Sequence, residues 1–288
     1  MNYRHAFHAG NFADVVKHIV LARILTYLHE KPAAFRVIDT HAGAGLYDLT
    51  GEEASRGGEW LTGIARMMQA RLPDEAADLV RPYLDIVRAF NSGNQLQAYP
   101  GSPLIARALM RPQDRMVVCE LERGARKQLV RALHRDAQAR VVELDGWTAL
   151  GAFVPPQERR GLVLVDPPYE SRDEFARLAS GFSAAFAKWP TGIYALWYPI
   201  KHRRLADDLA HEVAHTLAQS PLGGREGLRI EFSVAPQMEG GGLTSAGLLV
   251  VNPPWTLARE LKVILPELVR PLGQGGAGRF RVAGLREG

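Results

Sequence analysis

The chain has 288 residues, of which 47% are hydrophobic, and its formal net charge at pH 7 is +4. That length allows one large domain or a domain with an insertion. The single Cys119 excludes an internal disulfide and suits a reducing compartment. We find neither an apolar run of roughly 18 residues, as a membrane span needs, nor an apolar signal-peptide core. We therefore expect a cytoplasmic protein that has no membrane partner.

Short apolar runs alternate with helical periodicity along the chain. The periodicity predicts helices at 12–29, 122–134, 173–188, 203–217 and 256–268. The apolar runs predict strands at 35–38, 116–119, 140–144, 162–165, 192–197, 228–234 and 246–251, with a short edge strand around Phe280 and Val282. This alternation indicates an α/β fold with a mostly parallel sheet and helices on both sides. Ligands of such folds bind beyond the carboxyl ends of the strands.

The segment between the first two strands is too long for a simple crossover. Within residues 50–97, apolar residues recur at helical spacing over 60–68 and again over 79–90. We expect a small helical subdomain here, inserted into a main domain made of residues 1–49 and 98–288.

The first predicted strand ends in a glycine-rich turn that contains Asp39, Gly43 and Gly45. Glycines at such a turn allow the backbone to approach a bound ligand closely. A dinucleotide fingerprint would place a third glycine where Asp48 stands, so the pattern argues against a nicotinamide or flavin cofactor. Asp39 lies four positions before Gly43, which better suits a cofactor with an amino-acid moiety and no phosphate.

Two further strand ends are acidic. A carboxylate at Glu120 can accept both hydroxyls of a ribose, and the pair Asp145-Gly146 can read the edge of an adenine. Taken singly, each of these acids is more often a solvated side chain.

The next strand ends in Asp166-Pro167-Pro168-Tyr169, a pattern that suits methylation of an amino nitrogen. The Asp166 carboxylate and the Pro167 carbonyl can accept the two hydrogens of that amine and free its lone pair for attack. The prolines make the turn rigid, and Tyr169 offers a face on which a base can stack. The segment 252–255, Asn-Pro-Pro-Trp, has the same form, so the tetrapeptide alone does not decide between the two.

Order along the chain separates the two tetrapeptides. The glycine-rich turn, Glu120, Asp145 and Asp166 follow successive strands in the order that an S-adenosylmethionine methyltransferase needs. Only the first tetrapeptide fits this order, so catalysis is assigned to Asp166, Pro167 and Tyr169.

Longer motifs resemble the RlmJ family, bacterial methyltransferases that modify the N6 of an adenine in large-subunit (23S) ribosomal RNA. The resemblance runs through nearly the whole chain. It is carried by YRHAFHAGN at 3–11, ADVVKH at 13–18, DTHAGAG at 39–45, YPGSPLIA at 99–106, LVDPPYE at 164–170 and GIYALWYP at 192–199.

The resemblance implies a Rossmann-like class I methyltransferase fold, with the helical insertion as a platform for RNA or only a layer on the sheet. It implies that segment 1–18 closes over the site. We expect no metal, because His5, His8 and His18 lack the spacing of a zinc motif and the cofactor's own positive charge makes its methyl group electrophilic. We expect a monomer. The expected S-adenosylmethionine contacts are His18, His41, Gly43, Ser102, Glu120, Asp145, Gly146 and Asp166, and the expected substrate contacts are Tyr3, His5, Lys17 and Tyr169.

Other interpretations remain open from the residues themselves. Asp14 and His18 are spaced to pair along a helix, and His18 can equally be a satisfied core histidine. The basic clusters at 123–135 and 201–204 can contact phosphates or simply face solvent. The alternative functions are a DNA adenine-N6 methyltransferase, a protein-glutamine methyltransferase, which usually has Asn in place of Asp166, and a non-catalytic RNA-binding module.

Overall fold

A mixed eight-stranded sheet forms the centre of the molecule. The computed structural model describes residues 4–93, 95–171, 173–220, 222–223, 226–238 and 241–285. The strand order across the sheet is β10-β8-β9-β7-β6-β1-β4-β5. The strands are β1 (Arg36–Asp39), β4 (Arg115–Cys119), β5 (Ala139–Val142), β6 (Gly161–Val165), β7 (Ile193–Pro199), β8 (Gly227–Ser233), β9 (Ser245–Val251) and β10 (Arg279–Gly284).

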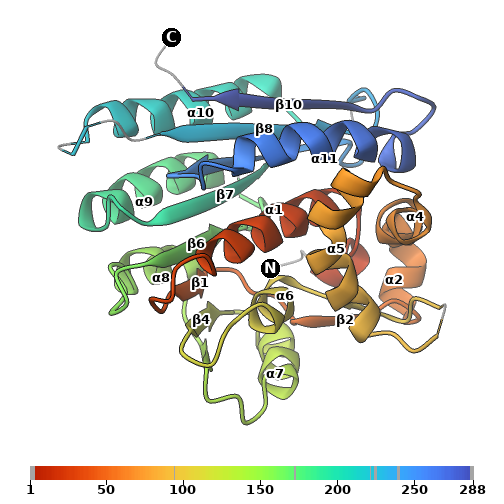
Figure 1. Ribbon diagram of the computed structural model, residues 1–288, viewed down its shortest axis with the longest axis horizontal. Helices are drawn as coiled ribbons and strands as arrows, with labels where there is room; N and C mark the ends of the chain where they lie inside the picture. The colour runs from red at the N-terminus through yellow and green to blue at the C-terminus, as the bar shows by residue number, and fades with distance from the viewer. Residues whose placement is uncertain are drawn as a thin grey trace.

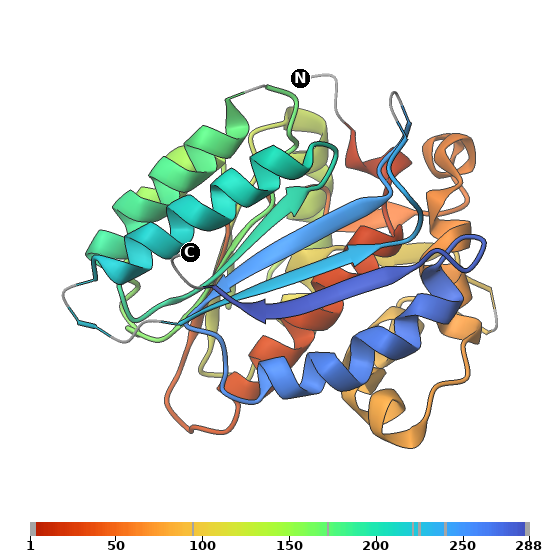
Figure 2. The same cartoon turned by 90° about the horizontal axis from the view of Figure 1, so that it is seen from above.

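Helices cover both faces of this sheet (Figures 1 and 2). One face packs against α1 (Phe12–Leu28), α6 (Ser102–Ala108), α7 (Arg123–Ala132) and α11 (Leu257–Leu272). The other packs against α8 (Gly146–Ala152), α9 (Glu174–Lys188) and α10 (Arg203–Ala218). The result is the predicted three-layer α/β arrangement.

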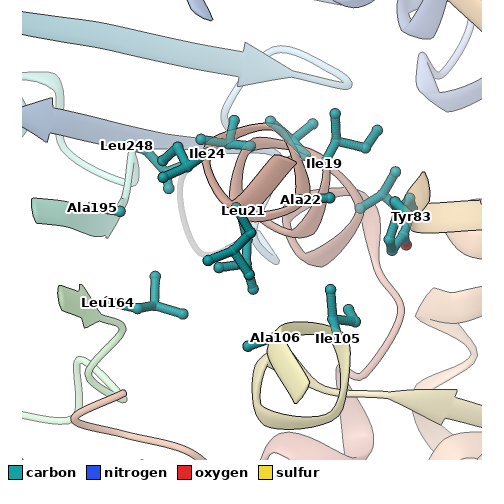
Figure 3. Close-up of a cluster of buried hydrophobic side chains, with 14 of the residues drawn as sticks. Ile19, Leu21, Ala22, Ile24, Tyr83, Ile105, Ala106, Leu164, Ala195 and Leu248 are labelled. Atoms are coloured by element: carbon teal, nitrogen blue, oxygen red, sulfur yellow. The ribbon is translucent and has the colours of Figure 1, made fainter. Parts of the chain in front are cut away.

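Burial alternates along each central strand because each face has its own apolar cluster. All residues of β6 are buried: Leu162 and Leu164 join the cluster around α1, and Val163 and Val165 join the cluster around α9. Figure 3 shows α1 inside the first cluster, between the sheet, α6 and α5 (Asp74–Ala89). The helix is apolar almost all round, as expected for one with neighbours on every side.

Strand direction divides the sheet. β1, β4, β5, β6 and β7 are mutually parallel, whereas β9 is antiparallel to both β7 and β8, and β10 is antiparallel to β8. The carboxyl ends of the parallel strands therefore meet at one edge, which we call the carboxyl edge. β9 ends at the opposite edge, because Val251 pairs with Tyr194 at the start of β7. The prediction of a parallel-dominated sheet is confirmed.

The insertion is helical, as expected. It contains α2 (Glu52–Gly57), α3 (Glu59–Thr62), α4 (Ile64–Gln69) and α5. A two-stranded sheet of β2 (Leu46–Asp48) and β3 (Ala98–Pro100), which was not predicted, brings its two ends together. Tyr83 and Val87 of α5 share one apolar cluster with α1 and α11. That residues 50–97 form a separate subdomain stays a prediction.

The predicted strands and long helices are all present, and their ends differ from the predictions by a few residues. The edge strand at Phe280 and Val282 is confirmed as β10. The short helices α6 and α8 were not predicted, because seven residues are too few for a clear helical period. Within the described residues no helix combines the length and apolarity needed to cross a membrane.

Candidate active site

A cavity of about 630 Å³ opens at the carboxyl edge, beyond the ends of β1, β4, β5 and β6. Its volume is within the range of small-molecule sites. Most of the predicted site residues line it: His5, Lys17, His18, His41, Gly43, Ser102, Glu120, Asp145, Gly146, Asp166 and Pro167. Tyr169 is not among the lining residues, and Tyr3 lies outside the described residues. Arg4, His5 and Ala6 form part of the wall, so the N-terminal segment covers some of the cavity.

The turn after β1 places bare backbone and a carboxylate side by side. Gly43 has φ +64°, and a Cβ there would lie 2.2 Å from the Tyr47 hydroxyl, so glycine is required. The Gly43 amide donates to Oε2 of Glu120 at 2.8 Å, and the Glu122 amide donates to Oε1 at 2.7 Å. Burial raises the pKa of Glu120. These two amides fix the carboxylate in an orientation suited to accepting ligand hydroxyls.

Asp39 lies beneath the cavity and does not line it. Its carboxylate accepts hydrogen bonds from the Ser102 hydroxyl at 2.6 Å and from the His41 amide at 3.3 Å. Burial raises the pKa of Asp39 to about 6, although the Ser102 hydrogen bond opposes the rise. Asp39 therefore orients two lining residues, a more indirect role than its sequence position indicated.

The end of β5 forms the next part of the wall. Asp145 caps α8 by accepting from the Thr148 amide at 3.0 Å. A Cβ on Gly146 would lie 2.4 Å from Nε2 of His41, so only glycine lets the backbone pass here. The His41 ring meets Trp147 edge-on at 5.3 Å between centroids, and burial lowers the pKa of His41 to about 4. His41 is thus a neutral side chain at pH 7.

A buried network connects the N-terminal segment with Asp166. Lys17 forms an ion pair with Oδ2 of Asp166, and its Nζ lies 2.7 Å from Oδ1 of Asp14. The other oxygen of Asp14 accepts from Nε2 of His5 and from the Gly10 amide, both at 2.9 Å. Burial would lower the pKa of Lys17, but the two carboxylates raise it on balance. Lys17 is therefore a fixed cation beside the predicted catalytic acid.

His18 is only half satisfied. Its Nδ1 bonds the Tyr99 hydroxyl at 2.7 Å, and that hydroxyl lies 3.0 Å from the hydroxyl of Tyr83. Its Nε2 is buried and has no hydrogen-bond partner among the described residues. Burial, reinforced by the charge of Lys17, lowers the pKa of His18 to about 3. The suggested hydrogen bond between Asp14 and His18 is wrong, because Asp14 bonds Lys17 and His5.

Tyr169 is turned away from the cavity. It has φ +54°, and its hydroxyl donates to the Trp197 carbonyl at 2.7 Å. Its ring contacts those of Phe175 and Trp197, with centroids 4.9 and 5.6 Å away. Pro168 lines the cavity next to it. The predicted base-stacking role of Tyr169 stays a prediction.

Several lining residues were not foreseen from the sequence. Arg177 lies over the ring of Trp147, with Cζ 5.0 Å from the ring centroid, and both side chains line the cavity. The position of Trp147 directly after Asp145-Gly146 was a usable signal, whereas Arg177 had none. His8 and Glu59 do not line the cavity, and Nδ1 of His8 lies 2.8 Å from Oε1 of Glu59. The described residues contain no cluster of His, Cys, Asp and Glu side chains suited to a metal ion.

A Rossmann-like sheet with these acidic strand ends around one cavity defines a class I methyltransferase. A family model described as "Ribosomal RNA large subunit methyltransferase D, RlmJ" matches residues 32–284. The chain is 42% identical over 283 residues to "Ribosomal RNA large subunit methyltransferase J" of Escherichia coli (strain K12), and the match covers 98% of both chains. It is 39% identical to the protein of that name from Haemophilus influenzae, again over 98% of each.

The fold is also shared with a solved relative. A crystal structure of a protein from Legionella pneumophila superposes with a TM-score of 0.85 at 32% identity, covering 96% of this chain and 98% of that one. The chain belongs to the RlmJ family, as its motifs predicted, and it is a methyltransferase.

Proposed function

We propose that the protein transfers a methyl group from S-adenosylmethionine to the N6 of an adenine in 23S ribosomal RNA. The observation that carries this proposal is the position of Asp166, which lines the cavity at the end of β6. Only Oδ2 of Asp166 is paired, with Lys17, and Oδ1 has no partner among the described residues. The names of the relatives, which specify the large ribosomal subunit, support the substrate.

The cavity walls fit the proposed methyl donor. The unpartnered Nε2 of His18 is a buried polar atom that a ligand group can satisfy. The bare backbones at Gly43 and Gly146 leave room that a Cβ would fill. The oriented carboxylate of Glu120 is placed to accept ribose hydroxyls, and Asp145 with Gly146 to meet an adenine edge. When bound, S-adenosylmethionine supplies a methyl group made electrophilic by its positively charged sulfur.

The acceptors at Asp166 and Pro167 make the adenine amino group nucleophilic. Oδ1 of Asp166 and the Pro167 carbonyl accept the two amino hydrogens, which frees the nitrogen lone pair that the ring otherwise delocalises. The nitrogen lone pair would bond to the methyl carbon, the carbon–sulfur bonding pair would stay on sulfur and neutralise it, and the amine proton would be lost to water through Oδ1 of Asp166. Lys17 and Asp14 keep Asp166 in place throughout, so catalysis rests on orientation and on preorganised acceptors.

The adenine has to be unpaired or flipped to reach this cavity, because its amino group is otherwise held in the helix. His5 lies at the wall where such a base would enter, and Tyr3 and Tyr169 are the further proposed contacts. A ribosomal RNA substrate would place the protein in the cytoplasm.

The test is direct. The protein is incubated with S-adenosylmethionine and either protein-free large-subunit ribosomal RNA or duplex DNA, and digested nucleosides are identified by mass spectrometry. We expect N6-methyladenosine from the RNA alone, and at least about 100-fold less with the Asp166→Ala variant, which lacks the side-chain acceptor for the amine. Methyladenine from DNA alone would overturn the RNA substrate and keep the chemistry. If the protein binds the cofactor but methylates neither the RNA nor the DNA, then a protein-free nucleic acid is not its substrate.

A further inference from the structure

A second hollow lies on the same rim of the sheet as the active site. It has a volume of about 430 Å³ and lies where β7 and β8 end and β9 and β10 begin. Its walls include Lys201, Arg203 and Arg279, together with Ser233, Ser245 and Gln237. Because β7 is parallel to β6, Lys201 follows its strand at the same edge as Asp166. We call this hollow the basic groove.

The cations of the basic groove differ in what they pair with. Arg203 lies 2.8 Å from both carboxylate oxygens of Glu231, inside a network that also contains Arg229 and Asp207. In that network two arginines face two carboxylates, so it carries no net charge. Lys201 and Arg279 are exposed, and in the described part of the chain neither has a carboxylate partner. The groove therefore has two uncompensated positive charges.

The surroundings strengthen this potential. The residues before and within the first turn of α10, Lys201-His202-Arg203-Arg204, are all basic or titratable, and that turn contains no acidic residue. Cations at the amino end of a helix oppose the helix dipole, an arrangement that an anion bound there would relieve. The Ser245 hydroxyl donates to the Ser233 hydroxyl at 2.8 Å, which leaves the Ser233 hydrogen as a donor next to the charges.

The groove also adjoins the N-terminal segment. The hydrogen bond with Glu59 raises the pKa of His8, and the charge of Lys201 opposes that rise. Lys201 is thus close enough to act electrostatically on His8. His5, in the same N-terminal segment, lines the active-site cavity. A polyanion that placed one nucleotide in the cavity would have the basic groove along its path.

We propose that the basic groove binds the phosphate backbone of the substrate RNA at nucleotides flanking the target adenine, with Lys201 and Arg279 as the phosphate contacts. This inference rests on the proposed RNA substrate. Phosphate contacts fix register and orientation without reading sequence, which is what a site next to a single-base pocket requires. Arg203 is a structural member of the groove, because its charge is already paired with Glu231.

The test compares two double variants. Lys201→Ala/Arg279→Ala removes both unpaired cations of the groove. Arg259→Ala/Lys262→Ala removes two exposed cations near the start of α11, which follows β9 at the opposite edge; neither has a carboxylate partner among the described residues. Each protein is titrated with labelled protein-free large-subunit RNA in filter binding between 50 and 200 mM salt, and methylation kinetics are measured in parallel.

Each lost phosphate contact lowers the slope of log affinity against log salt by roughly 0.7–0.9, so the groove variant should lose roughly 1.4–1.8 units. Across a fourfold change in salt, the wild type should then lose roughly 7- to 12-fold more affinity than the groove variant. We expect a higher KM for RNA, an unchanged kcat at saturating RNA, and an unchanged KM for S-adenosylmethionine. The opposite-edge variant should match the wild type.

The outcomes separate the two proposals. An unchanged slope in the groove variant, or equal losses in both double variants, overturns the groove, and an acidic protein partner would then be the better occupant. A reduced slope in a protein that methylates no adenine supports the groove as an RNA site and overturns the proposed reaction. Wild-type protein that binds no RNA overturns both.

Discussion

Two segments of this chain have the same sequence pattern but different structural roles. Asp166-Pro-Pro-Tyr169 follows β6 at the carboxyl edge, where Asp166 lines the cavity and pairs with Lys17. The segment 252–255, Asn-Pro-Pro-Trp, follows β9 at the opposite edge. There the Asn252 amide donates to the Pro190 and Gly192 carbonyls at 3.0 and 2.7 Å, which ties the end of β9 to the start of β7.

Strand direction, more than the tetrapeptide itself, separates the two sites. A rigid proline turn with a polar first residue can present acceptors to a ligand or clamp a strand end. It does the first only where several parallel strands end together and leave a cavity. Because β9 is antiparallel to its neighbours, the second turn has no such surroundings.

The largest effects are expected when the first side chain of each segment is replaced by alanine. We expect Asp166→Ala to lower kcat by about 10²- to 10⁴-fold, because one of the two acceptors of the target amine is lost. Asn252→Ala should leave kcat unchanged and lower the free energy of unfolding by about 1–3 kcal/mol, since two backbone carbonyls lose their donor. Steady-state kinetics and urea unfolding measure the two effects. Equal losses of activity would contradict the division.

Glycines at the two edges give the next largest contrast. Alanine at Gly146 would put a Cβ 2.4 Å from His41 and 2.5 Å from the Thr40 carbonyl, within the cavity wall. We expect the Kd for S-adenosylmethionine to rise by about 10- to 100-fold, a cost of about 1.4–2.8 kcal/mol. Gly284 ends β10 at the opposite edge and faces open space, so Gly284→Ala should bind normally. Calorimetric titration with S-adenosylmethionine alone measures both Kd values. An unchanged Kd for Gly146→Ala would mean that Gly146 does not contact the cofactor.

The aromatic residues of the two segments provide a finer contrast. Base stacking is worth about 1–3 kcal/mol, so Tyr169→Ala should raise the KM for RNA by roughly fivefold or more without changing cofactor affinity. Tyr169→Phe, which loses only the bond to Trp197, should keep most of the affinity for RNA. Trp255 is 73% exposed, and Trp255→Ala should change neither constant. A collapse of cofactor affinity in Tyr169→Ala would make Tyr169 a structural residue.

The last contrast is a pH dependence of stability that arises from His18, at the carboxyl edge. The pKa of buried His18 is about 3 against an ordinary 6.5, so between these values the unfolded chain binds a proton that the folded chain does not. The free energy of unfolding should therefore fall as pH drops below 6.5, by up to about 1.4 kcal/mol per pH unit from this residue.

Comparison with a variant isolates that contribution, because Asp39, with its pKa raised to about 6, acts in the opposite sense. His18→Asn should show a shallower loss of stability in urea unfolding at pH 7, 6 and 5, whereas Asn252→Ala should run parallel to the wild type. Parallel curves for His18→Asn would mean that His18 titrates normally.

Much of this architecture was predictable from the sequence. Periodicity indicated the long helices and central strands, and the order of acidic strand ends selected Asp166 over Asn252. The antiparallel direction of β9 was not predicted, because a buried strand has the same apolar sequence pattern whether it runs parallel or antiparallel to its neighbours.

The less predictable part of the site depends on contacts between distant segments. The i,i+3 spacing of Asp14 and Lys17 on α1 indicates that these two can pair. Nothing in the sequence indicates that Lys17 also joins Asp166, which follows β6. The orientation of Tyr169 away from the cavity depends on the carbonyl of Trp197, which belongs to another strand. The family resemblance placed Lys17 near the site, but the residues alone did not.

The outermost strand has a further consequence for handling the protein. β10 exposes Arg279, Phe280 and Arg281, and its outer side offers backbone groups with which another copy of the chain could pair. Like charges on such a strand repel a second copy and discourage aggregation. Arg279 therefore has a second effect, on colloidal behaviour, and its removal should make the predicted monomer more prone to self-association. The oligomeric state of every variant in this strand should therefore be measured by sedimentation at increasing protein concentration.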